Sequence, residues 1–92
     1  MNIINVNIKE IKPYEKNAKK HSRTQISNVA QSIKEFGWQQ PIVVDDDGEI
    51  IIGHCRYEAA KQMKLDTVPV VFAKGMSKEQ ANKLRLLDNK LM

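Results

Sequence analysis

The sequence has only one cysteine, no long apolar run and no repeat, and these shortages exclude several classes of protein. A single cysteine in 92 residues excludes an internal disulfide and, with no signal-peptide pattern at the start, favours the cytoplasm. No apolar run approaches the roughly 20 residues that a membrane-spanning helix needs, so we expect no membrane partner. There is no repeat, low-complexity tract or linker. Because apolar residues still make up 41% of the chain, we expect one folded domain over residues 1–92.

The excess of positive charge is confined to one segment. Residues 9–23 contain six Lys or Arg and two Glu, and the rest of the chain is balanced, so the net charge of +4 belongs to this segment. Such a stretch attracts the phosphates of nucleic acids or nucleotides. A solvated, lysine-rich loop is the alternative, and charge alone leaves both open. The candidate contacts to nucleic acid are Lys12, Lys16, Lys19, Lys20 and Arg23.

Apolar residues at helical spacing predict two helices in the first two thirds of the chain. One begins after Ser22 or Thr24, which are capping residues, and runs to about Phe36. Gly37 then suits the left-handed residue that ends many helices. The other covers residues 54–64.

A third helix is predicted from the capping box of Ser77 and Gln80. Its predicted apolar face consists of Ala81, Leu84, Leu87 and Leu91. This helix reaches the last residue without a stop signal, so we expect the chain to be part of a longer protein.

Four strands are predicted, and they set the fold class. Residues 4–8 alternate apolar and polar side chains, and "PIVV" and "EIIIG" flank the Asp-Gly turn of residues 45–48, a hairpin signal. Residues 67–73 form another strand, in which Pro69 favours an edge or an irregular start. The order is β-α-β-β-α-β-α, which predicts an α+β domain with a small mixed sheet and packed helices.

The stretch Gly53-His54-Cys55-Arg56 joins a predicted strand to a predicted helix. Unpaired N–H groups at the helix start, a glycine without a side chain and an arginine together suit an anion. A tight turn with Arg56 in a surface ion pair is the alternative. Two adjacent ligands with no second pair do not form a zinc site. Cys55 as a nucleophile is disfavoured, because no residue is placed by the sequence to orient a base.

These residues are part of a longer pattern that resembles the N-terminal domain of ParB-type proteins, in the ParB/sulfiredoxin superfamily. The pattern is a helix ending in Gly37, then "QPIVV", a hairpin, and a G-x-x-R-x-x-A box filled by Gly53, Arg56 and Ala59. The likeness continues through "VPVVFA" to "LLDN". The form "GH-x-RYEAA" with a closing "DN" looks closest to ParB-like domains attached to phage or prophage DNA methyltransferases.

The resemblance implies a nucleotide site. Gly53, His54, Cys55 and Arg56 would cradle the triphosphate of CTP or another nucleoside triphosphate. Lys19 and Lys20 stand where ParB proteins complete the pocket, and Asp88 and Asn89 match a pair that holds Mg²⁺ there.

The chain departs from the family box at three positions. His54 replaces a Glu, Cys55 replaces the first Arg and Glu58 replaces the last Arg, which preserves a phosphate site but not the full CTP-specific set. Sulfiredoxins read G-C-H-R, so here the cysteine is displaced by one residue and His54 takes the catalytic position.

We therefore expect a phosphate- or nucleotide-binding domain of a DNA-associated protein, active in DNA partitioning or in phage DNA modification or regulation. One alternative is a Mg²⁺-dependent nuclease or phosphotransfer enzyme, for which His54 and Asp88 are the candidate catalytic residues. A scaffold with an empty pocket is the other. The expected partners are a nucleotide, DNA bound weakly and without sequence preference, and a second copy of the chain.

Overall fold

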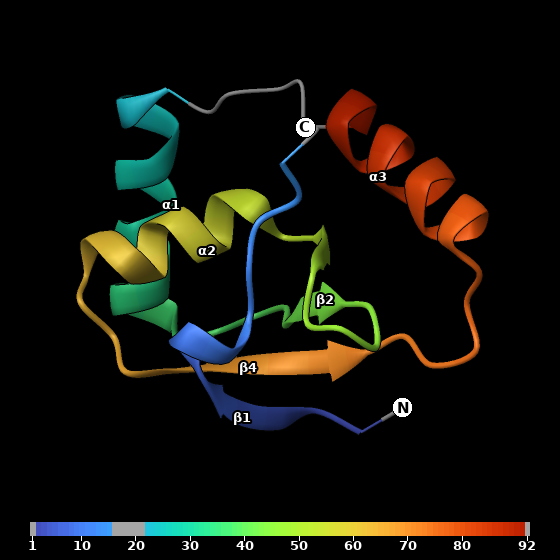
Figure 1. Cartoon of the computed structure of the whole chain (residues 1–92). Coiled ribbons are helices and arrows are strands. Elements are labelled where there is room, and N and C mark those ends of the chain that lie inside the picture. Colours follow the sequence, from blue (N-terminus) through green and yellow to red (C-terminus); the bar gives the residue numbers. More distant parts are fainter. Residues whose placement is uncertain (1, 16–21, 92) are drawn as a thin grey trace.

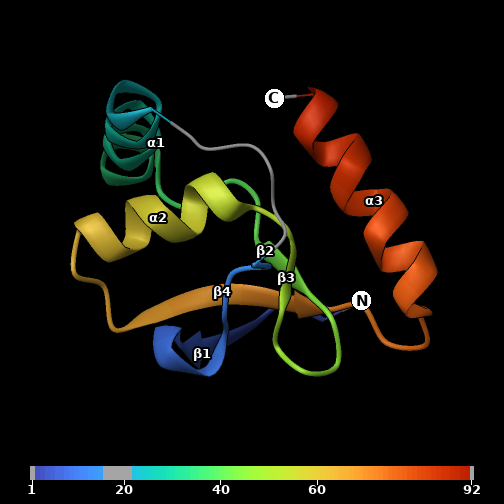
Figure 2. The ribbon, with the colours of Figure 1, turned by 45° about the horizontal axis from the view of Figure 1, so that its top comes forward.

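The computed structural model describes residues 2–15 and 22–91, with side chains up to residue 87. The elements are β1 (Ile4–Asn7), the 3₁₀ helix η1 (Ile8–Glu10), α1 (Arg23–Phe36), β2 (Ile42–Val44), β3 (Ile50–Ile52), α2 (His54–Gln62), β4 (Thr67–Phe72) and α3 (Lys78–Leu91). This is the predicted order β-α-β-β-α-β-α, with η1 added. In Figure 1, α1 and α2 lie together, whereas α3 stands apart from them beside the β2–β3 hairpin. Figure 2 shows the same separation after a rotation.

The four strands form one mixed sheet in the order β1-β4-β2-β3. β1 runs antiparallel to β4 and β3 antiparallel to β2, while β2 and β4 are parallel. Of the two alternatives predicted for Pro69, a sheet edge or an irregular start, the edge does not apply to β4 as a whole, because β4 lies inside the sheet. The parallel pairing begins only at Val70, however, and Pro69 is paired with Asn5 alone. Proline therefore stands where β2 does not yet pair with β4.

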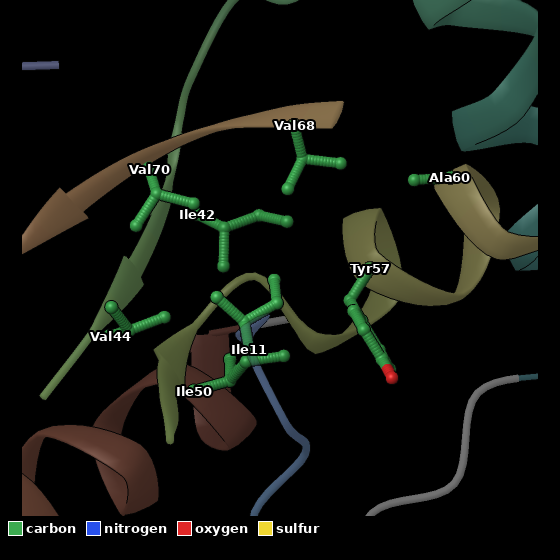
Figure 3. Packing of buried hydrophobic residues seen from close by; sticks show 8 residues of the cluster. All are labelled: Ile11, Ile42, Val44, Ile50, Tyr57, Ala60, Val68 and Val70. Atoms are coloured by element: carbon green, nitrogen blue, oxygen red, sulfur yellow. The ribbon is translucent and has the colours of Figure 1, made fainter. Parts of the chain in front are cut away.

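Side chains of β2 divide between two hydrophobic clusters. Ile42 and Val44 point into the larger cluster, which also contains Tyr57 and Ala60 of α2 (Figure 3). Val43, whose side chain faces the other way along the strand, joins the smaller cluster around Ile51. α2 and α3 are therefore held by different clusters.

Helix α1 begins and ends as its sequence predicts. Ser22 is the N-cap, and its hydroxyl accepts from the N–H of Gln25 while the Gln25 side chain accepts from the N–H of Ser22. At the other end Gly37 has a φ of 77°, and its N–H donates to the Ile33 carbonyl over 2.9 Å. These caps satisfy backbone groups that a helix leaves open at its ends.

The predicted apolar face of α3 is wrong at one position. Ala81 is buried and Leu84 is half-buried, but Leu87 is 55% exposed. Arg85 occupies the inner face instead and is only 5% exposed. The side chain of Leu91 lies outside the described residues. Helix α3 therefore meets the hairpin through a charged residue as well as through apolar ones.

The β2–β3 hairpin is closed by polar contacts of its turn. One oxygen of Asp45, Oδ1, accepts from the N–H groups of Asp47 and Glu49, each over 2.9 Å. Gly48 has a φ of 83°, and a β carbon there would lie 2.6 Å from the Glu10 carbonyl oxygen. Lys12 then pairs with the hairpin, donating to Gly48 and accepting from Ile50. This pairing brings the segment before residue 16 alongside the turn into α2.

Candidate anion site at the start of α2

Gly53 forms a sharp turn between β3 and α2. It is the N-cap of α2, has a φ of 105° and provides no capping side chain. A β carbon at this position would lie 3.0 Å from Nη1 of Arg56 and 3.3 Å from Cγ1 of Ile42. The turn therefore requires glycine for its backbone angle, and it leaves the helix start without a side-chain cap.

The guanidinium of Arg56 lies over this turn. Arg56 is half-buried, and its Nη2 donates to Oε1 of Gln40 over 2.6 Å. Beside it lies a groove of about 310 Å³ between α1 and the loop that follows it, lined among others by Ser32, Trp38 and Gln39. Among the residues with described side chains, Arg56 forms no surface ion pair, and its contact there is with a neutral amide. The positive charge of Arg56 is therefore not cancelled by Gln40.

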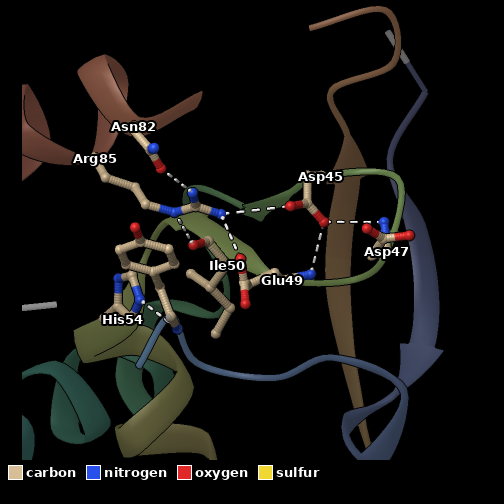
Figure 4. A network of polar contacts seen from close by, with 8 residues as sticks. Asp45, Asp47, Glu49, Ile50, His54, Asn82 and Arg85 are labelled. Atoms are coloured by element: carbon tan, nitrogen blue, oxygen red, sulfur yellow. Dashed lines mark hydrogen bonds and ion pairs between the residues drawn. The ribbon is translucent and has the colours of Figure 1, made fainter. Parts of the chain in front are cut away.

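His54 is directed into the protein. Its side chain is 7% exposed, and its Nε2 accepts from the backbone N–H of Tyr14 over 3.3 Å (Figure 4). An accepting Nε2 requires that this nitrogen carry no proton. The contact ties the helix start to the segment that leads into residues 16–21.

Cys55 is buried, with 1% of its surface exposed. Burial raises the pKa of the Cys55 thiol above its ordinary value; nearby Arg56 opposes this shift and Glu58 adds to it. A thiol with a raised pKa stays protonated at neutral pH, and the protonated form is a poor nucleophile. The Cys55 side chain is thus a buried, protonated thiol that is not suited to bind an anion. Its backbone N–H, at the start of α2, is suited to one.

The predicted phosphate-binding residues Gly53 to Arg56 form the N-cap and first turn of α2. Lys12 and Arg23 have exposed side chains, as contacts to nucleic acid require. The predictions for Lys16, Lys19 and Lys20 fall outside the described residues, as do those for the side chains of Asp88 and Asn89.

A polar network around Arg85 was not predicted from the sequence. Its Nε donates to the Ile50 carbonyl over 2.8 Å and its Nη1 to Oδ1 of Asn82 over 2.9 Å. Its Nη2 lies 3.5 Å from Asp45 and 3.4 Å from Glu49 (Figure 4). The sequence did contain a signal that Arg85 lies on the inner face of α3, because it follows the buried Ala81 by one helical turn. The spacing of apolar residues favoured Leu87 for that face instead.

The same guanidinium covers the ring of Tyr14, 4.0 Å from its centroid. Tyr14 thus contacts Arg85 with its ring and His54 with its backbone N–H. The start of α2, the segment before residue 16 and α3 are joined through this one residue.

A second hollow, of about 450 Å³, lies beside this network and is acidic. Its charged lining residues are Glu15, Asp45, Asp46, Asp47, Glu49, Lys78 and Arg85. Within residues 2–15 and the part of the chain from residue 22 onward with described side chains, no three His, Cys, Asp or Glu residues are grouped so as to hold a metal ion. Of the turn carboxylates, that of Asp45 accepts from backbone N–H groups of the hairpin and contacts Arg85.

The four-stranded mixed sheet and the three α-helices of the described residues have a ParB/sulfiredoxin-like fold. The ParB N-terminal domain family matches residues 1–90, and the chain belongs to this family.

None of the described helices is both long and apolar enough to cross a membrane.

Two relatives show how the chain compares in sequence. The ParB-like nuclease domain-containing protein YnaK of Escherichia coli is 45% identical over 73 residues, which are 79% of this chain and 84% of that protein. The probable chromosome-partitioning protein ParB of Rickettsia prowazekii is 34% identical over 85 residues, 91% of this chain. The chain spans only 29% of that second protein.

Two solved structures confirm the fold. A C-terminally truncated chromosome-partitioning protein ParB from Caulobacter crescentus, complexed with CTP-γ-S, superposes with a TM-score of 0.81 and 21% identity; the match covers all of this chain and 54% of that one. Sulfiredoxin from Arabidopsis thaliana superposes with a TM-score of 0.74 and 22% identity, over 94% of this chain and 98% of that one. The predicted ParB/sulfiredoxin-like α+β class is confirmed.

Proposed function

We propose that this domain binds the phosphates of a nucleotide at the turn from Gly53 to Arg56. The observation that carries the proposal is the guanidinium of Arg56, held over a helix start that no side chain caps. Backbone N–H groups at a helix start and a guanidinium both favour phosphate oxygens. The Caulobacter relative of the same fold is complexed with CTP-γ-S, which supports a nucleoside triphosphate such as CTP as the ligand.

Calorimetric titration with CTP, ATP and pyrophosphate tests this function. We expect Arg56→Ala to weaken binding about tenfold or more, the effect of losing a charge-assisted hydrogen bond. Lys61→Ala is the matched control: it removes one positive charge from an exposed position of the same helix and should bind as the wild type does. Equal binding by wild type and Arg56→Ala, or no binding by wild type, would refute the proposal.

The role of Mg²⁺ is part of the same proposal. Asp88 and Asn89 are the proposed ligands, on the last turns of α3. Titrating CTP with and without Mg²⁺ against wild type and Asp88→Ala measures this role, since only the wild type should gain affinity from the metal. A gain of the same size in Asp88→Ala would reject Asp88 as the ligand.

DNA is the proposed second partner, through the basic segment of residues 9–23. Contacts from Lys12, Arg23 and the lysines between them would be to the phosphate backbone, without sequence preference. Such binding weakens steeply with salt because it releases counterions. Fluorescence anisotropy should show a flatter salt dependence after Lys12→Ala and Arg23→Ala. A salt-insensitive or strongly sequence-selective interaction would point to another surface.

The process that this domain serves is proposed from its relatives. The Rickettsia relative is named a probable chromosome-partitioning protein, which supports a role in DNA partitioning. The sequence form "GH-x-RYEAA" with a closing "DN", which resembles domains attached to phage DNA methyltransferases, would favour DNA modification or its regulation instead. We expect slow turnover at most, because Nε2 of His54 already accepts a hydrogen bond and Cys55 is buried.

A further inference from the structure

The hydrogen bond between Gln40 and Arg56 joins two segments that are far apart in the sequence. Nη2 of Arg56 reaches Oε1 of Gln40 over 2.6 Å, and the residues are separated by 16 positions. Gln40 is exposed and lies just before β2, while Arg56 is half-buried in the first turn of α2. A long arginine side chain has considerable rotamer entropy when it is free to move. Gln40 restricts that freedom before any ligand arrives.

The two ends of the guanidinium have different surroundings. Nη2 is bound to Gln40, whereas Nη1 lies 3.0 Å from the place where Gly53 would carry a β carbon. The contact with Gln40 therefore fixes the plane of the group and leaves its other N–H donors over the turn. A guanidinium has five donors, so one bond to Gln40 does not exhaust it.

The chemistry of the partner matters as much as its position. A glutamine side chain is neutral, so it orients the guanidinium without offsetting its charge. A glutamate at the same place would hold the group equally well but would compete with a phosphate for it and repel the phosphate. Gln40 thus differs from the ion-pair partner that an exposed arginine commonly has.

We propose that Gln40 is a positioning residue for the anion, holding the Arg56 guanidinium over the Gly53 turn with its full charge. This inference rests on the proposed function, since it concerns the same site. It explains why Arg56 has a defined place although its side chain is only half-buried. Gln40 orients the donor, and Arg56 makes the contact to phosphate.

The test uses three substitutions at the loop, each measured by calorimetry with pyrophosphate at fixed ionic strength. Gln40→Ala should weaken binding about threefold to tenfold, the range expected when one hydrogen bond is lost. Gln40→Glu should weaken it more, while its melting temperature stays at or above that of the wild type, because an exposed ion pair forms. Gln39→Ala, which changes the neighbouring residue of the same groove, should bind as the wild type does.

A second readout separates positioning from a structural effect. In the wild type the Nε–H resonance of Arg56 should be sharp in nitrogen NMR spectra, and in Gln40→Ala it should broaden as the side chain becomes mobile. In an Arg56→Ala background, Gln40→Ala should cause no further loss of affinity, because the group that it orients is gone.

The outcomes distinguish this inference from the function on which it rests. If Arg56→Ala binds as the wild type does, or if the wild type does not bind pyrophosphate, both ideas are overturned. If Arg56→Ala weakens binding but Gln40→Ala and Gln40→Glu do not, only the role of Gln40 is overturned. The same holds if Gln40→Ala weakens binding equally in the Arg56→Ala background.

Discussion

Two arginines of this domain have opposite surroundings. Arg85 is 5% exposed and contacts a carbonyl, an amide, two carboxylates and an aromatic ring. Arg56 is half-buried, and its hydrogen bond goes to the neutral side chain of Gln40. A buried arginine with each of its three guanidinium nitrogens hydrogen-bonded can stabilise the fold but has few donors left for a ligand. An arginine whose partner among the described residues is neutral contributes little to the fold and keeps its charge and further donors for an anion.

The largest effect expected from this comparison is that of Arg85→Ala. The substitution leaves Asp45 and Glu49 without their partner and opens a space beneath α3, so the free energy of unfolding should fall by about 3 kcal/mol. Urea unfolding measures it. Lys83→Ala, an exposed position on the same helix, is the control and should change stability by less than about 0.5 kcal/mol. A loss for Arg85→Ala as small as that of the control would show that the network adds nothing.

Sequence reasoning predicted what local rules determine. Capping residues, the Asp-Gly turn and the glycine before α2 act over a few neighbouring residues, and the structure confirms the elements that they predict. The Arg85 network joins residues 35 and 40 positions apart, and the contact of His54 with Tyr14 spans 40. Only the folded chain creates such neighbours. The apolar stripe of α3 therefore misassigned Leu87, because spacing cannot tell that an arginine would find carboxylates inside.

Gly53 lies between the surroundings of the two arginines. The Arg56 guanidinium lies over it, and it directly follows β3, whose Ile50 carbonyl accepts from Arg85. Gly53→Ala should cost about 2 kcal/mol of unfolding free energy, because its φ of 105° strains an alanine and the added carbon crowds Ile42. Gly75→Ala is the control: its φ is 77°, but nothing lies within 4 Å of an added β carbon, so it should cost only the backbone strain of about 1 kcal/mol. Thermal unfolding of both variants measures the difference. Equal costs would show that crowding at the anion turn is negligible.

The ring of Tyr14 packs on the buried arginine, Arg85. Tyr14→Leu removes the aromatic face under Arg85 but keeps the N–H that donates to His54, and should cost about 1 kcal/mol. Tyr14→Phe keeps the face and should be within a few tenths of the wild type. Chemical denaturation of the two variants side by side is the measurement. A cost for the phenylalanine variant as large as for leucine would assign the effect to the hydroxyl group.

Cys55, beside Arg56, gives the region of the anion turn a dependence on pH. Because its thiol pKa is raised in the folded protein, the folded state holds this proton more tightly than the unfolded state. The resulting stability is present below the pKa of an unfolded thiol, about 8.5, and is lost as pH rises through the folded pKa. Unfolding free energies from pH 7 to about pH 10 should therefore fall more steeply for the wild type than for Cys55→Ala. If the unfolding free energies of the wild type and of Cys55→Ala fell in parallel with pH, the raised pKa of the Cys55 thiol would be contradicted.

The smallest effect on stability is expected for Arg56→Ala, and it is the sharpest test of the comparison. The substitution removes a half-buried side chain and one hydrogen bond to an exposed glutamine, so the free energy of unfolding should change by less than about 0.5 kcal/mol. Measured without ligand, its urea midpoint should stay within experimental error of that of the wild type. With saturating pyrophosphate, the wild type should gain stability by mass action while Arg56→Ala should not. A destabilisation of Arg56→Ala near that of Arg85→Ala would show that both arginines serve the fold, and the distinction drawn between them would fail.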